Sequence, residues 1–266
     1  MLKIENVVKV FNPGTINEKV ALNGLNLHLK EGEFVTVIGG NGAGKSTMLN
    51  AVAGVWEVDA GKIIIDDVDI THLPEYKRAK YIGRVFQDPM MGTAATMQIE
   101  ENMALAARRG QHRTLRKGIT KAEREEYREQ LKILDLGLED RMTAKVGLLS
   151  GGQRQALTLL MATLVTPKLL LLDEHTAALD PATAEVVLDL TKQIVAENNL
   201  TCLMITHNLQ SSLDLGNRTI MMAGGKILLD IAGQERSGLT PDDLLSKFRQ
   251  QANKNLDNDR ILFSAL

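Results

Sequence analysis

The chain has 266 residues, a formal net charge of −2 and 24% charged residues. A charge this close to neutral excludes a strongly basic, histone-like polyanion binder, and a hydrophobic content of 44% is too high for a disordered chain. The single cysteine, Cys202, excludes an internal disulfide and fits a reduced compartment. No run approaches the roughly 18 apolar residues that span a bilayer. The sequence therefore predicts a cytoplasmic protein, and any membrane role would need a second polypeptide.

The chain begins with predicted strands at 4–10 and 20–29, which flank an Asn12-Pro13-Gly14 turn, and continues with a short β-rich run at 33–38. A helix is predicted at 45–53. Short apolar runs, several of them continuous as in strands covered on both faces, then occur at 61–66, 81–86, 169–173, 200–206 and 219–222. Helical patterns lie at 151–164, 182–197 and 208–215.

Strands that alternate with helices predict an α/β fold with a mostly parallel sheet. The opening strands are too close together for crossover helices, so an antiparallel β subdomain is expected near the N-terminus. We predict one domain over 1–266, with a core at 1–89 and 165–235, a helical insert at 90–164, and a helical tail at 236–266.

The insert contains a basic tract at 102–122, with six Lys or Arg and no Asp or Glu, followed by a charged helix near 121–136. The tract fits either a solvated loop or a surface for a polyanion.

A glycine-rich loop follows the strand at 33–38. Gly39 to Ser46 matches the pattern G-x-x-x-x-G-K-[ST], which cradles phosphates with backbone N–H groups at a helix N-terminus. Lys45 would reach the β- and γ-phosphates, and the Ser46 hydroxyl would coordinate Mg²⁺. The sequence therefore predicts a nucleotide phosphate site.

Two acids follow the apolar run at 169–172. Asp173, at the strand end, would hold Mg²⁺, usually through water, and Glu174 would accept a proton from an attacking water. Alone, the pattern also fits a strand end with solvated carboxylates. Downstream of a phosphate loop, the catalytic interpretation is favoured.

A second glycine cluster, Leu149-Ser150-Gly151-Gly152-Gln153, precedes the helical pattern of 154–164. Ser150 is a predicted N-cap, and the glycines would expose backbone donors. Alone, the cluster fits either an ordinary capped helix start or a second anion site.

These residues resemble the ABC-type ATPases, in which the pentapeptide corresponds to the signature motif. Four further elements lie in the family's order: Gln87 resembles the glutamine loop, 178–180 the D-loop and His207 the switch histidine, and Phe11 stands where an aromatic residue stacks on adenine. The resemblance covers about 1–235. It implies that ATP is contacted by Phe11, Val20, Gly39, Asn41, Gly42, Ala43, Gly44, Lys45, Ser46, Thr47, Ser150, Gly151, Gly152 and Gln153.

The resemblance also implies a head-to-tail homodimer that sandwiches two ATP molecules. One complete phosphate loop and one spare anion site per chain suit such a two-fold pair. Ser150, Gly152 and Gln153 would bind the γ-phosphate in trans. The catalytic residues would be Glu174, His207, Gln87 and Lys45, and the Mg²⁺ ligands Ser46, Gln87 and Asp173.

The function implied is that of an ATP-hydrolysing subunit of an importer, peripheral on the inner face of the cell membrane. Its partners would be a separate membrane permease and a solute-binding protein, and its cargo a small solute such as an amino acid. Alternatives are the ATPase of a two-part exporter and a soluble ABC ATPase of the cluster-assembly or nucleic-acid class, although no nucleic acid is expected.

A histidine after the two acids and a group of methionines near Gln87 lead to two further predictions. His175 stands where the family usually has Pro, and it either titrates near neutrality beside Glu174 or is a tolerated variant. Met90 and Met91, in a loop, are predicted to contact the permease, whereas Met97 and Met103 belong either to the same surface or to the core of the insert.

Overall fold

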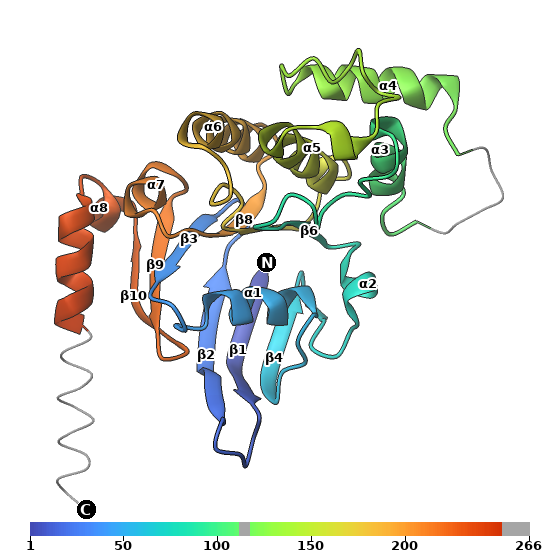
Figure 1. The fold of residues 1–266 in the computed structure, drawn as a ribbon. Helices are drawn as coiled ribbons and strands as arrows, with labels where there is room; N and C mark the ends of the chain where they lie inside the picture. Colours follow the sequence, from blue (N-terminus) through green and yellow to red (C-terminus); the bar gives the residue numbers. More distant parts are fainter. Residues whose placement is uncertain (112–117, 252–266) are drawn as a thin grey trace, which may run out of the picture. The chain divides into compact units, whose positions relative to one another are not determined.

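The computed structural model describes residues 1–111 and 118–251. The chain divides into two compact units, one comprising Met1–His72 and the chain from Leu203 onward, the other comprising Leu73–Cys202. Each unit contains strands and helices (Figure 1). The domain boundaries predicted from the sequence, at 89/90, 164/165 and 235/236, differ from the boundaries of these two units. That division of the chain stays a prediction.

The first unit contains an antiparallel sheet with the strand order β2-β1-β4-β5. Its strands are β1 (Leu2–Phe11), β2 (Lys19–Leu29), β4 (Ala60–Ile65) and β5 (Val68–Asp69). Leu2 lies opposite Leu29 on one side and Ile65 on the other, and all three are fully buried. The alternation of apolar and polar residues places one face of the sheet in the core. The predicted antiparallel subdomain is confirmed.

The first unit also contains β3 (Phe34–Gly39), β9 (Arg218–Ala223) and β10 (Lys226–Ala232), in the order β10-β9-β3. β3 pairs with β9 in parallel, and β9 pairs with β10 antiparallel. Gly224 and Gly225, both with positive φ, connect β9 to β10, as tight hairpins require. Strand β10 was not predicted from the sequence, and its exposed, half-buried and buried residues show no clear alternation.

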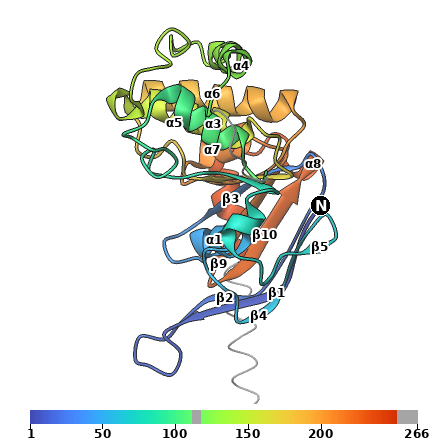
Figure 2. The same cartoon turned by 90° about the vertical axis from the view of Figure 1, so that its right-hand side faces the viewer.

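Helix α1 (Lys45–Ala53) contacts both β2 and β3, and Figure 2 shows it between the strands of the two sheets of this unit. Two short helices, α7 (Leu209–Asp214) and α8 (Gly233–Arg236), and a helix over 241–251 complete the unit. Leu244 of that last helix is fully buried in a cluster with Ile38, Met221 and Ile231. The described part of the C-terminal region therefore belongs to the core of the first unit.

In the second unit, β6 (Ile82–Val85) and β7 (Leu169–Asp173) form a parallel pair. Helix α5 (Gly151–Thr163) packs against β6 and against α6 (Pro181–Glu197). Gly83 permits the close packing, because a Cβ there would lie 2.5 Å from the carbonyl oxygen of Ala162. The parallel pairs β3–β9 and β6–β7 confirm the predicted α/β class with a mostly parallel sheet.

The remaining helices of the second unit are α2 (Glu75–Arg78), α3 (Ile99–Ala107), α4 (Lys121–Lys132) and the 3₁₀ turn η1 (Val146–Leu148). Capping boxes begin α3 and α4, with Glu101 and Glu123 as the reciprocal residues. Strand β8 (Thr201–Ile205) crosses the boundary between the units. Within the described residues, no helix combines the length and the apolar character needed to cross a membrane.

Candidate active site

The phosphate loop joins β3 to α1 in the first unit. Gly42 and Gly44 have φ values of 78° and 100°, a region that favours glycine. A Cβ on Gly44 would also lie 2.5 Å from the carbonyl oxygen of Ala21, so the loop requires glycine there. Gly44 is the N-cap of α1 and supplies no side-chain cap, which leaves backbone donors of the first turn for another acceptor. An anion is the acceptor that such a helix end favours.

Two ammonium groups lie at this loop. Lys45 is only 5% exposed, and its Nζ donates to the carbonyl oxygens of Gly39 and Gly40 at 2.8 and 3.2 Å. Lys19 is the second, because its Nζ lies 3.4 Å from the position of a Cβ on Gly42. Sequence analysis missed Lys19, which precedes the predicted strand at 20–29 and lies far from the loop in sequence. The two charges make the loop electropositive and suited to a polyphosphate.

The expected adenine platform has a second aromatic residue. Phe11 and Trp56 meet edge to face, with ring centroids 5.4 Å apart, and Trp56 is 44% exposed. The β1–β2 register places Phe11 opposite Lys19, and Val20, which is exposed, lies one residue further along β2. Trp56 was missed, although a single Trp just after α1 was a signal. These apolar groups offer a surface for a base.

His207 lies directly after β8, in the first unit, and is exposed. Hydrogen bonds hold the residues on either side of it. The Thr206 N–H donates to the Val37 carbonyl at 3.1 Å. Asn208 caps α7, because its side chain accepts from the Ser211 N–H at 2.9 Å. The backbone on both sides of the exposed His207 is therefore held by hydrogen bonds.

Asp173 is the last residue of β7 in the second unit, and Glu174 follows it. The Asp173 carboxylate is 3.9 Å from the Arg84 guanidinium, which also lies 4.0 Å from Glu75 and over the ring of Phe86. Burial lowers the pKa of Arg84, while Asp173 and Glu75 oppose that change. Glu174 has φ +47°, an uncommon backbone conformation for a residue other than glycine. The chain thus turns sharply at the predicted catalytic base.

The signature residues form the N-terminus of α5. Ser150 is the N-cap, as predicted: its Oγ accepts from the Gln153 N–H, and the Gln153 Oε1 accepts from the Ser150 N–H, both at 3.2 Å. Gly152 faces α6, where a Cβ would lie 2.0 Å from Thr183 Cγ2. Gly151 is less constrained, with Leu179 Cδ2 at 3.4 Å. The close contact explains why position 152 takes glycine.

The segment around Gln87 is attached to α5. Gln155, fully buried, donates from Nε2 to the Phe86 carbonyl at 3.0 Å. A Cβ on Gly92 would lie 2.4 Å from Thr158 Cγ2, so that residue also packs on α5. Gln87 itself is exposed. The glutamine loop and the signature motif are thus connected through one helix.

The predicted site residues fall into two groups. Phe11, Val20, the phosphate loop 39–47 and His207 belong to the first unit. Gln87, the signature 150–153, Asp173 and Glu174 belong to the second unit.

Of the two alternatives for His175, the structure disfavours the one in which its ring titrates near neutrality. The side chain is 1% exposed, and burial lowers the pKa of His175 to about 4. An imidazole with that pKa is neutral at physiological pH.

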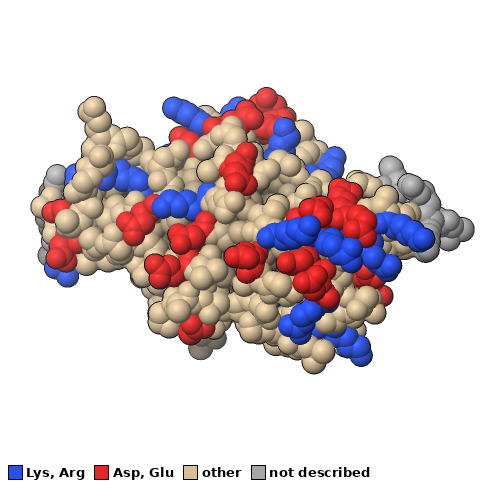
Figure 3. All heavy atoms as spheres, turned by 90° about the horizontal axis from the view of Figure 1, so that it is seen from above, with Lys and Arg blue, Asp and Glu red and all other residues tan. Residues whose placement is uncertain are grey.

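The charged surface of the insert is largely neutralised by internal pairs. Arg108 bonds to Glu123 at 3.0 Å, and Arg109 donates to the carbonyls of Ala162 and Val165. The face of Figure 3 shows acidic and basic side chains interspersed. Arg113, Arg116 and Lys117 of the basic tract lie outside the described residues. Arg108 and Arg109 of the tract are therefore engaged by the protein itself, and Lys121 is exposed at the start of α4.

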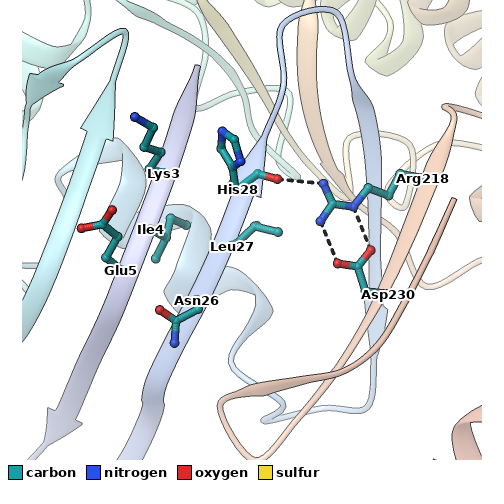
Figure 4. A pocket seen from close by; sticks show the side chains of 8 residues that line it. All are labelled: Lys3, Ile4, Glu5, Asn26, Leu27, His28, Arg218 and Asp230. Atoms are coloured by element: carbon teal, nitrogen blue, oxygen red, sulfur yellow. Dashed lines mark hydrogen bonds and ion pairs between the residues drawn. The ribbon is translucent and has the colours of Figure 1, made fainter.

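A hollow of about 410 Å³ in the first unit lies apart from the predicted residues (Figure 4). Arg218 there bonds to Asp230 through two nitrogens at 2.7 and 2.8 Å and to the His28 carbonyl at 2.7 Å. Lys3 pairs with Asp67 at 3.3 Å. Because both cations are paired, the hollow lacks the features of an anion site. Its lining consists of Lys3, Ile4, Glu5, Asn26, Leu27, His28, Arg218 and Asp230.

Comparison with known proteins identifies the class. The ABC transporter family model matches residues 22–177. The chain is 44% identical over 253 residues to a tyrosine transport ATP-binding protein of Clostridioides difficile, covering 93% of this chain and 98% of the relative. It is 38% identical to the methionine import ATP-binding protein MetN of Rhodopseudomonas palustris, covering 85% of this chain and 60% of that protein.

A solved structure has the same fold. A dimeric ATP-binding cassette in a post-hydrolysis state, bound to ADP and Pi, matches with a TM-score of 0.74 and 31% identity over 87% of this chain and 98% of the other. The chain therefore belongs to the ABC transporter family, in its ATP-binding part. It binds ATP and hydrolyses it, and the resemblance drawn from the sequence is confirmed.

Proposed function

We propose that this chain is the ATP-hydrolysing subunit of an importer and powers uptake of an amino acid through a separate permease. The observation that carries the proposal is the 44% identity over 98% of a relative named for tyrosine transport. A second relative is named for methionine import. The decisive experiment is reconstitution of the complex in vesicles, with ATP inside and a solute-binding protein outside. ATP-dependent tyrosine uptake supports the cargo class; export, or uptake of no amino acid, contradicts it.

In the proposed reaction, the phosphate loop and Lys45 bind the β- and γ-phosphates and stabilise the negative charge that develops as the terminal bond breaks. Glu174 accepts a proton from the attacking water, and His207 holds the γ-phosphate. Phe11, with Trp56, supports the base. A Glu174→Gln variant retains the shape and the phosphate contacts but loses the base, so it should bind ATP and hydrolyse it at least 100-fold more slowly. Phosphate release measures the rate; wild-type turnover would refute the assignment of Glu174.

The donor set fits Mg²⁺. The proposed ligands, Ser46, Asp173 and Gln87, present hydroxyl, carboxylate and amide oxygens, the hard donors that Mg²⁺ prefers. The described residues contain no group of three or more His, Cys, Asp or Glu side chains that could hold a metal ion. In the proposed site, Asp173 is the one carboxylate ligand, and the substrate phosphates would supply further oxygens. When bound, the ion would neutralise phosphate charge. Turnover should disappear on chelation and return with added Mg²⁺.

We also propose the head-to-tail dimer. The signature donors of one chain would bind the γ-phosphate held by the loop of the other, because each chain has one phosphate loop and one further glycine-rich helix start. The related cassette of known structure is described as dimeric. Light scattering of the Glu174→Gln variant should show monomer without ATP and dimer with ATP. A monomer in both conditions would refute action of the signature in trans.

The permease surface is proposed to include an exposed groove of the second unit, of about 740 Å³, between α2 and the end of α3. Tyr76 and Leu105 are 74% and 52% exposed there, beside the cations Lys77 and Lys80. Apolar side chains ringed by cations suit a partner helix with acidic ends. The full lining is Leu73, Tyr76, Lys77, Ala79, Lys80, Leu105, Ala106, Arg108, Arg109, Gly110 and Gln111.

The methionine loop adds a second candidate contact. Met90 and Met91 are 59% and 68% exposed, whereas Met103 is fully buried and belongs to the core. Met97 is half-buried. A Met90→Asp/Met91→Asp variant and a Tyr76→Glu/Leu105→Glu variant should fold and hydrolyse ATP, because neither touches a phosphate contact. Both should fail to co-purify with the permease, since carboxylates would be desolvated against an apolar helix. Normal recovery of either variant would remove that surface from the interface.

A further inference from the structure

His175 directly follows Glu174 and is buried in the second unit. Its Nε2 lies 3.0 Å from the Oγ1 of Thr191, a fully buried residue of α6. The Thr191 hydroxyl donates its one hydrogen to the Val187 carbonyl at 2.7 Å. Nε2 must therefore be the donor in the His175–Thr191 bond, which fixes the tautomer with the proton on Nε2.

The other ring nitrogen makes this residue costly. Nδ1 is buried and has no hydrogen-bond partner among the described residues. A buried acceptor without a donor destabilises the folded state, whereas an apolar side chain of similar size would avoid that cost. The neutral ring is consistent with its lowered pKa. Because an apolar side chain would avoid this cost, the presence of a histidine calls for a role of its hydrogen bond to Thr191.

That bond attaches the chain next to Glu174 to α6. Glu174 has the left-handed φ of +47°, and its carbonyl accepts from the Ala177 N–H at 2.9 Å. At the far end of the same segment, Asp180 caps α6 by accepting from the Thr183 N–H at 3.1 Å. Residues 174–180 are therefore attached to α6 at both ends, once through His175 and once through Asp180.

We propose that His175 is a positioning residue for the hydrolytic reaction: its hydrogen bond to Thr191 anchors the strained turn at Glu174 and sets the direction of the Glu174 carboxylate. The inference rests on the proposed role of Glu174 as the base. Positioning matters because proton transfer in the transition state requires the base within hydrogen-bond reach of the water. A displacement of about 1 Å costs on the order of 100-fold in rate.

The test uses a matched pair at Thr191, which touches neither substrate nor metal in the proposed reaction. Thr191→Val keeps the shape and removes the hydroxyl, and Thr191→Ser keeps the hydroxyl. We expect Thr191→Val to lower kcat by roughly 10- to 100-fold with the KM for ATP unchanged, and Thr191→Ser to retain most of the rate. His175→Leu should behave as Thr191→Val does. Unchanged kcat in Thr191→Val and His175→Leu would overturn the proposal.

A double-mutant comparison separates positioning from a general structural effect. In the Glu174→Gln background, Thr191→Val should leave the residual turnover unchanged, because the group that it positions is already absent. An equal fold-loss in both backgrounds would overturn the proposal. Wild-type turnover in Glu174→Gln alone would instead refute the proposed base. Circular dichroism checks folding; if Thr191→Val does not fold, Thr191→Ala replaces it with the same expected and opposing outcomes.

Discussion

Two helices of this protein, α1 and α5, follow a glycine-rich stretch. They differ in whether a side chain caps the backbone N–H groups of their first turn. The N-cap of α1 is Gly44, which has φ 100° and provides no side-chain cap. The N-cap of α5 is Ser150, whose side chain forms a capping box with Gln153. The N-terminal N–H groups of α1 therefore need an acceptor from outside the helix, whereas at α5 the side chains of the capping box accept hydrogen bonds from N-terminal N–H groups.

This difference in capping predicts which steps, ATP binding or catalysis, depend on each of the two helix N-termini. In the proposed site, the backbone donors at the start of α1 have no side-chain cap to give up and would bind the phosphates directly, whereas the Lys45 ammonium would exchange its bonds to the Gly39 and Gly40 carbonyls for bonds to phosphate. At α5, the Ser150 and Gln153 side chains would have to exchange the bonds of the capping box for bonds to a phosphate in the proposed dimer. Such an exchange yields a smaller net gain than filling open donors. We therefore expect ATP binding to depend on the N-terminus of α1, and catalysis to depend on the N-termini of both α1 and α5.

The largest effect should come from Lys45→Ala. Removal of the ammonium from the α1 loop should lower hydrolysis by about 100- to 1,000-fold, because charge developing on the phosphates loses its main protein cation. Lys132→Ala, at an exposed residue of α4, is the control for loss of one positive charge. Phosphate release under saturating ATP gives both rates. Equal turnover in the two variants would contradict the assignment of the α1 start as the phosphate site.

A pair of glycine substitutions tests whether the shape of the α1 loop is required. Gly44→Ala should lose about 2 kcal/mol or more of stability, because its φ is 100° and its Cβ would lie 2.5 Å from the Ala21 oxygen. Gly40→Ala should be nearly neutral, since nothing lies within 4 Å of its Cβ position. Chemical denaturation measures both. A stable Gly44→Ala that binds ATP normally would show that the loop tolerates another shape.

The corresponding pair at α5 should spare ATP binding. Gly152→Ala would place a Cβ 2.0 Å from Thr183 Cγ2, displacing α5 from α6. We expect hydrolysis to fall by about 10-fold or more with ATP affinity unchanged. Gly151→Ala, whose Cβ would meet Leu179 at 3.4 Å, should have a smaller effect. A fluorescent-ATP titration beside the rate assay separates binding from turnover. Equal loss of affinity at 44 and 152 would remove the contrast between the two starts.

The smallest effect concerns the cap itself. Ser150→Ala should lower the free energy of unfolding by about 1 kcal/mol, the usual contribution of a serine N-cap. A Ser150→Asp variant should keep the cap and the stability, but its charge should oppose a phosphate at the same helix end. Thermal unfolding gives the stability and light scattering with ATP gives the dimer. A Ser150→Asp variant that dimerises normally would argue against a phosphate at the start of α5.

Much of this molecule was predictable because its signals are local. A glycine-rich loop between a strand and a helix, a buried strand that ends in two acids, and a serine three residues before a glutamine each determine a conformation through nearby backbone bonds. Leu169 to Asp173 is a strand and Ser150 is an N-cap, as the sequence predicted. Three of the missed elements have weak local signals: α2 has four residues, β5 has two, and β10 lacks alternation.

The tertiary structure decided what depends on residues far apart in the chain. The ammonium of Lys19 reaches Gly42, Trp56 packs on Phe11, and the His175 ring is buried against Thr191. The order of residues alone does not assign these contacts, because side-chain burial and pairing follow from packing across elements. Burial also decided the chemistry of His175, since desolvation disfavours the charged ring and lowers its pKa to about 4. The sequence by itself thus determined which chemistry the chain carries, and the packing decided which side chains support it.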